Sequence, residues 1–235
     1  MLALPQRELW TAYLELEALG QREEALGTLR AFLESMKELD ESAREAWALD
    51  RARAIVDAGD PQPLRLPLFV EVLFPALVRG VEAGTPGCAR WTASLLHLVR
   101  GRQERHFLPK EARTEAGLLR LALELDPSDG AARLQLIQEL SAALEYATHE
   151  APDTVLWDQD AVTTKAQCDE LLAELVEMER HMGIAGVAEL QEKNLVDLAE
   201  FCRFHLTSYR AFLGQREGKE SYRQFLDRAE PESAT

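Results

Sequence analysis

The spacing of the apolar residues constrains this chain most, because they recur every three or four positions along most of its length. Ala25, Leu29, Phe32, Met36 and Leu39 form one such series. Residues at this spacing share one face of an α-helix, whereas a half-buried strand alternates apolar and polar residues. No segment shows that alternation over the length of a strand. The sequence therefore predicts an all-α protein.

Short turns between the helical segments predict antiparallel helical hairpins. Gly20 and Gln21 separate a stripe that ends at Leu16 from the series that begins at Ala25. Two helices joined by so short a turn pack against each other. We expect eight to ten helices, arranged as an α–α superhelix of hairpins or as an irregular helical bundle.

Two segments resemble the tetratricopeptide repeat (TPR), a family of helical-hairpin solenoids. The segment from Leu19 to Ala25 (LGQREEA) is similar to the turn in the middle of the repeat, where Gly allows a tight turn and Ala lets the helices approach closely. The segment from Ala122 to Pro127 (ALELDP) is similar to the end of its second helix. This partial resemblance implies a TPR-like fold that presents a groove to a protein or peptide.

The chain is expected to form a single domain over residues 1–229, followed by a flexible tail at 230–235. The clearest interruption is the segment 59–63 (GDPQP), which predicts a seam between an N-terminal part of three helices and the rest. The most apolar stretch, 64–98, predicts the central core. Within it, Pro75 predicts a helix kink or a helix start, because proline lacks the amide proton that the preceding turn needs.

The charge balance bears on the kind of partner. The chain carries 41 acidic and 26 basic residues, a net charge of −15. Such a chain binds nucleic acid and anionic membranes poorly, because phosphate neutralisation supplies most sequence-independent affinity. A local exception comprises Arg90, Arg100, Arg102, Arg105, Lys110 and Arg113, which could hold an anion; the favoured interpretation is an exposed helix end or an ion-pair network with the acidic flanks.

Cysteine usage and the apolar runs favour a cytoplasmic location. Cys88, Cys168 and Cys202 are widely spaced and form no CxxC pair, which argues against a disulfide framework or a thiolate zinc site. The first ten residues reach a charge at Arg7 without an apolar core, unlike a secretory signal. The longest apolar run, 66–78, is too short to span a membrane.

The common catalytic and nucleotide-binding motifs are absent from the sequence. We therefore expect no cofactor, no metal and no catalytic residues. Cys202 and His205 are three positions apart and could share a metal, but a hydrogen-bonded core histidine is the favoured interpretation. The first functional hypothesis is a non-enzymatic cytoplasmic interaction module, of an adaptor, chaperone-like or inhibitor type.

The alternative is a small-molecule-binding or enzymatic helical domain with a pocket near the end of one helix. Tyr146, His149 and Glu150 would line this pocket, opposite Arg102 and His106. The competing interpretation is that His149 caps the helix, since a C-terminal position stabilises an imidazolium.

The most acidic stretch predicts a docking face. Residues 151–200 carry twelve acidic residues against three basic ones. Glu170, Glu174 and Glu177 represent this face, and such a field steers basic proteins or peptides toward it. The other interpretation is an exposed face that only keeps the protein in solution.

Overall fold

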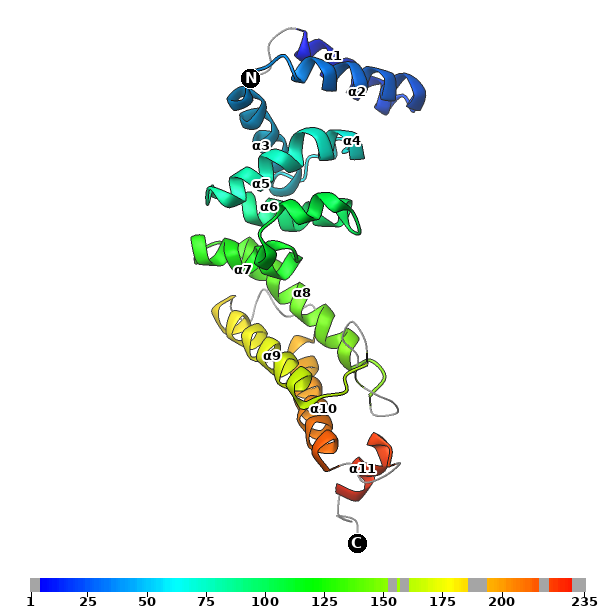
Figure 1. The fold of residues 1–235 in the computed structure, drawn as a ribbon, viewed down its shortest axis with the longest axis vertical. Helices are drawn as coiled ribbons and strands as arrows, with labels where there is room; N and C mark the ends of the chain where they lie inside the picture. Colours follow the sequence, from blue (N-terminus) through cyan, green and yellow to red (C-terminus); the bar gives the residue numbers. More distant parts are fainter. Residues whose placement is uncertain (1–4, 152–155, 157–160, 186–193, 216–219, 230–235) are drawn as a thin grey trace. The chain divides into compact units, whose positions relative to one another are not determined.

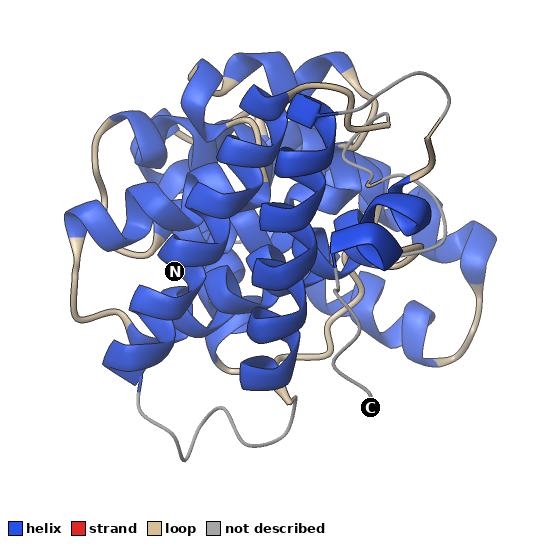
Figure 2. Ribbon diagram, turned by 90° about the horizontal axis from the view of Figure 1, so that it is seen from below, coloured by secondary structure: helices blue, strands red, loops and turns tan. Residues whose placement is uncertain are grey.

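A computed structural model describes residues 5–151, 156, 161–185, 194–215 and 220–229. Figure 2 shows helices joined by loops, with no β-strand in this described part of the chain, which confirms the all-α prediction. The same residues form ten helices, within the eight to ten expected. This number treats the continuous helical segment from Leu66 to Glu82, which contains a π-turn, as one helix. The chain groups into two compact units, Met1–Asp129 and Gly130–Thr235, which are described separately below.

The first unit is built from consecutive helices that each pack on a neighbour in the chain (Figure 1). Short 3-10 turns cover 96–99, 103–107 and 110–112. Its helices are α1 (Gln6–Ala18), α2 (Arg22–Met36), α3 (Glu41–Asp57), α4 (Leu66–Leu68), α5 (Phe74–Glu82), α6 (Cys88–Leu95) and α7 (Glu115–Leu125).

Helices α1 and α2 form the hairpin expected at Gly20. Gly20 has a φ of +72°, a left-handed conformation that glycine adopts without a steric cost. Ala25 is fully buried where the two helices meet. Any closely packed helical hairpin has these properties, so the relation to the tetratricopeptide repeat stays a prediction.

An aromatic cluster joins the first three helices. The Phe32 ring lies 5.3 Å from the rings of both Trp10 and Trp47, and Trp10 lies 5.3 Å from Tyr13. Phe32 and Tyr13 are completely buried. The apolar stripe of α2 therefore faces a core shared with α1 and α3.

The segment 59–63, where the sequence predicts a seam, lies inside the first unit. The Tyr13 hydroxyl donates a hydrogen bond of 3.0 Å to the Pro63 carbonyl. Arg65 donates two hydrogen bonds, of 2.8 and 2.7 Å, to the Glu17 carboxylate. The chain after the segment is thus tied back to α1, and the unit continues to Asp129.

The predicted irregularity at Pro75 is confirmed as a π-turn over Phe69–Leu73 that leads directly into α5. A proline ring clashes with the carbonyl four residues earlier, and a widened turn accommodates it. Phe69, Leu73, Phe74 and Leu77 around it are all buried, as expected of the central core.

In the second unit, α8 (Gly130–Thr148), α9 (Lys165–Ala185) and α10 (Leu195–Gln215) all contact one another. The short helix α11 (Tyr222–Ala229) packs on α10 through rings, with Tyr222 lying 4.9 Å from Tyr209 and 5.7 Å from Phe212. In the described parts of both units, no helix has the length and apolar character needed to cross a membrane. The expected tail at 230–235 lies outside the described residues.

Candidate functional site

The predicted docking face lies on α9. This helix buries Cys168, Leu171, Leu175 and Met178 at intervals of three or four residues against α8 and α10. Glu170 is exposed on the side of α9 away from these buried residues. Glu174 and Glu177 follow it along the helix and are half-buried. The three carboxylates therefore follow one side of the helix over two turns.

Arginines of α10 pair with the α9 acids that border α10. Arg210 Nε lies 2.5 Å from Asp169 Oδ1, and Arg203 forms an ion pair with Glu179. These pairs reduce the negative charge along the α9–α10 seam. Glu170 is therefore the carboxylate of this face that contributes most directly to the field over solvent.

Large apolar side chains are exposed on the same two helices. Val176 and Ile184 of α9 are 56% and 58% exposed. Phe204 of α10 is 51% exposed. Ile184 follows Glu177 by seven residues, about two helical turns, so an exposed apolar side chain lies on the same side of α9 as the three carboxylates.

Part of the acidic stretch cannot be placed on this face. Asp153, Asp158, Asp160, Glu189 and Glu192 lie outside the described residues.

The group at the end of α8 has the geometry of a helix cap. The Tyr146 and His149 rings stack with their centroids 5.3 Å apart, and His149 Nδ1 lies 2.5 Å from the Tyr146 carbonyl oxygen. His149 Nε2 lies 3.7 Å from Glu150 Oε1. Both the His149 and Glu150 side chains are more than 40% exposed. The contact of His149 with a carbonyl of the last turn of α8 agrees with the interpretation of this histidine as a helix cap.

Arg102 and His106, the other expected members of that pocket, belong to the first unit. Arg102 pairs with Glu104 at 2.8 Å, and this hydrogen bond lowers the pKa of the Glu104 carboxyl. The His106 carbonyl accepts a hydrogen bond of 3.1 Å from Arg113. Each of these contacts is local to the segment 100–113.

Four arginines of the basic stretch, Arg90, Arg100, Arg102 and Arg105, pair with acidic residues, which favours the ion-pair interpretation over an anion site. Arg90 bridges Asp57 at 2.7 Å and Asp129 at 2.9 Å. Arg100 lies 3.4 Å from Glu115. The acidic partners lie up to 39 positions away in the sequence, so the excess of arginine in the stretch is compensated in the fold.

Cys202 and His205 are both buried and contact different partners. Cys202 Sγ lies 3.5 Å from Thr148 Oγ1 and 3.8 Å from the Leu144 carbonyl oxygen. His205 Nδ1 lies 3.1 Å from the Tyr222 hydroxyl, which in turn donates to the His205 carbonyl. His205 is thus the hydrogen-bonded core histidine that the sequence favours.

Burial of His205 predicts a loss of stability in mild acid. Burial lowers the pKa of His205 below its ordinary value of 6.5. The unfolded chain then binds a proton more readily than the folded one, so stability is complete above about pH 6.5 and falls as the pH drops through the folded pKa. We expect the urea midpoint to fall from pH 7.5 to pH 5, and to fall less in His205→Gln.

The control for this prediction is His106→Gln, which removes an exposed histidine. It should leave the pH dependence of the urea midpoint unchanged. An equal pH dependence in wild type and His205→Gln would contradict the assignment to His205.

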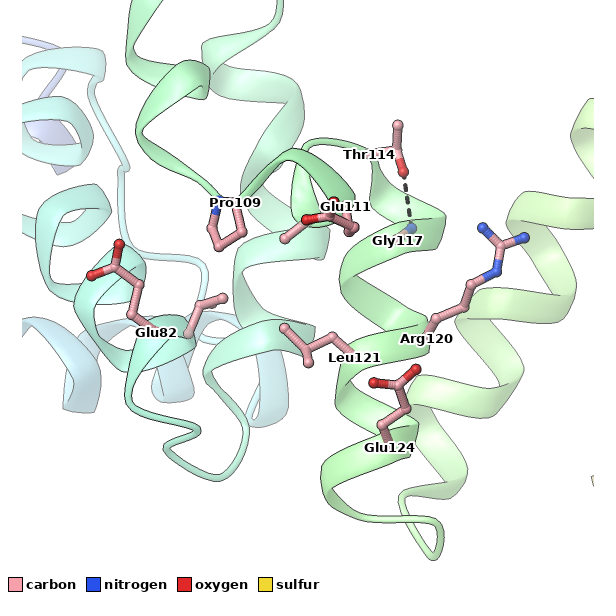
Figure 3. Close-up of a pocket in the computed structure, with 10 residues that line it drawn as sticks. Glu82, Pro109, Glu111, Thr114, Gly117, Arg120, Leu121 and Glu124 are labelled. Atoms are coloured by element: carbon pink, nitrogen blue, oxygen red, sulfur yellow. Dashed lines mark hydrogen bonds between the residues drawn. The ribbon is translucent and has the colours of Figure 1, made fainter.

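The first unit contains a cavity of ≈ 470 Å³ between the end of α5, the turn 109–112 and α7 (Figure 3). Thr114 caps α7, and its hydroxyl accepts a 2.9 Å hydrogen bond from the Gly117 amide. A Cβ on Gly117 would lie 2.0 Å from the Glu111 carbonyl oxygen. Glycine at this position therefore lets the turn rest directly on the first turn of α7.

Carboxylates and apolar side chains line this cavity together. Its carboxylates are Glu82 from α5, Glu111 from the turn and Glu124 from α7, all three exposed. Leu121 projects from α7 toward α5, whereas the Arg120 side chain points in the opposite direction (Figure 3). The remaining apolar lining is Val81, Pro109 and Ala112.

Sequence reasoning did not predict this cavity. Its carboxylates lie 13 and 29 positions apart and belong to three different elements, so no local pattern connects them. The single local signal is the Thr114-x-x-Gly117 start of α7, which indicates a capped helix and not a site.

Comparisons of the chain with protein-family models, with curated proteins and with solved structures find no match.

Proposed function

We propose that this chain is a non-catalytic, cytoplasmic protein-interaction module, and that a basic protein or peptide docks on the exposed face of α9. One observation carries the proposal: exposed Ile184 lies two helical turns beyond Glu177, on the side of α9 that carries the carboxylates of Glu170, Glu174 and Glu177. Protein interfaces combine apolar contacts with a polar rim, and complementary charge steers the partner.

The state of the cysteines supports a cytoplasmic, non-catalytic role. Cys88, Cys168 and Cys202 are all buried and unpaired. Burial raises the pKa of the Cys88 and Cys168 thiols to about 11, and raises that of Cys202 as well. Thiols in this state are neither disulfide-forming nor nucleophilic at neutral pH. The alternative pocket at Tyr146, His149 and Glu150 has less support, because His149 contacts the end of its own helix.

Reversing the charge of the α9 face should slow association with a partner. Proteins captured from the native cytoplasm with the wild-type chain, identified by mass spectrometry, supply the partner for stopped-flow measurement. We expect its association rate to fall about tenfold or more between ~0.1 M and ~1 M salt, because salt screens exposed charges. The variant Glu170→Lys/Glu174→Lys/Glu177→Lys should associate more slowly at low salt, with an unchanged circular dichroism spectrum.

The matched control is Glu15→Lys/Glu23→Lys/Glu38→Lys, which changes the net charge equally at exposed positions of the first unit. It should slow association much less than the α9 variant. The single variant Glu170→Lys tests the most exposed position without altering half-buried ones. An acidic partner, or an association rate insensitive to salt and to these reversals, would exclude the proposal.

A further inference from the structure

The cavity in the first unit has features of a binding site separate from the α9 face. Its volume of ≈ 470 Å³ lies within the range of about 300–1,000 Å³ that is typical of ligand clefts. A water molecule occupies only about 30 Å³ of liquid. The cavity is therefore large enough for an organic group with an extended body.

The charge of the lining favours a cation, because three carboxylates outnumber its one basic residue, Arg120, whose side chain points away from Leu121 (Figure 3). Glu82, Glu111 and Glu124 supply three carboxylates to the cavity. Among the described residues, no three acidic, histidine or cysteine side chains are grouped closely enough to hold a metal ion. The three carboxylates thus belong to the lining without converging on one point, which favours an extended organic cation over a metal ion.

Apolar side chains complete the recognition surface. Leu121 and Val81 form the wall between the carboxylates. Leu125, next to Glu124, is 48% exposed and lies against the turn after Glu82, where a Cβ on Gly84 would be 3.5 Å from its Cδ2. An apolar surface thus continues from the cavity wall to the adjoining turn.

Lysine and arginine side chains match a cavity lined by both carboxylates and apolar side chains. Each carries a cationic head on a methylene stem, and the stem packs on apolar surface while the head meets carboxylates. We propose that this cavity binds a lysine or arginine side chain of a partner protein's basic peptide segment, with a neighbouring apolar residue of that segment placed against Leu125. This site lies in the first unit and does not depend on the α9 face.

The test uses synthetic peptides and the full chain. The probe is an acetylated and amidated hexapeptide with one lysine flanked by leucine, in a glycine–serine background. Binding is followed by NMR through the methyl signals of Val81, Leu121 and Leu125 and quantified by calorimetry. We expect these three methyl groups to shift, and we expect acetylation of the lysine amine to weaken binding about tenfold.

Two variants of unchanged size locate the site. Glu82→Gln/Glu124→Gln removes two cavity carboxylates and should weaken the lysine peptide about tenfold. Glu8→Gln/Glu15→Gln changes the net charge equally at exposed positions of α1 and should leave the affinity unchanged. The α9 variant Glu170→Lys should also bind the peptide normally, which separates this site from the docking face.

Three outcomes would overturn the inference. The lysine peptide could fail to bind up to millimolar concentration, its acetylated form could bind equally well, or the shifted signals could lie outside the cavity. Loss of peptide binding in the variant Glu170→Lys would show that the peptide binds to the α9 face. It would therefore also exclude the cavity as a separate binding site.

Discussion

The variant Phe32→Ala is expected to lose about 3–5 kcal/mol in the free energy of unfolding, the range observed when a fully buried phenylalanine is truncated. Phe32 is completely buried, and its ring lies 5.3 Å from both Trp10 and Trp47. Truncation would leave a cavity where α1, α2 and α3 meet. Urea denaturation followed by tryptophan fluorescence measures this loss.

Glu23→Ala on the same helix is the matched control for Phe32→Ala. Glu23 is exposed in the first turn of α2, where an acidic side chain contributes a few tenths of a kcal/mol up to about 1 kcal/mol through the helix dipole. Its replacement should therefore cost at most about 1 kcal/mol, well below the loss expected of Phe32→Ala. A loss below about 1 kcal/mol for Phe32→Ala would mean that the α2 face assigned to the core is exposed.

The variant Gly117→Ala is expected to destabilise the protein by about 1–2 kcal/mol, the overpacking cost less the gain in helix propensity. The new Cβ would lie 2.0 Å from the Glu111 carbonyl oxygen and 2.8 Å from Thr114 Oγ1, so either the turn 109–112 or α7 must move. Overpacking of this kind costs about 1–3 kcal/mol or more, and it outweighs the gain of about 1 kcal/mol in helix propensity. The same urea measurement detects the loss.

Gly27→Ala gives the opposite expectation in the same unit. Gly27 lies in α2, is exposed, and has no atom within 4 Å of the position of an added Cβ. The substitution should therefore stabilise the helix by about 0.5–1 kcal/mol. Equal effects of the two alanine substitutions would show that the turn 109–112 does not rest on α7 as described.

Helix content and helix faces were predictable because they depend on residues close together in the chain. The stripe from Ala25 to Met36 is buried, and the turn at Gly20 has the backbone conformation that a tight hairpin needs. Pro75 acts on its own preceding turn, so the irregularity before it was also predictable. The start of α7 at Glu115 is local as well, because the hydroxyl of Thr114 caps its first turn.

The candidate sites were predictable only in part, for the same reason. The acidic side of α9 follows from the sequence, because Glu170, Glu174 and Glu177 are separated by one helical turn each. The pairing of Asp169 with Arg210, 41 positions away, required knowledge of which face of α10 meets α9. The arginine-rich stretch likewise gains its partners Asp57 and Asp129 only in the folded chain.

The sequence by itself determined that this protein is helical, which side of each major helix is buried and where the excess negative charge lies. Periodicity and charge are local properties, and local hydrogen bonding and burial express them directly. Only the tertiary structure decided that the chain before and after 59–63 belongs to one unit, and that Glu82, Glu111 and Glu124 share a cavity. Both outcomes depend on contacts between distant segments, such as Glu17 with Arg65, and on one glycine that lets a turn touch a helix.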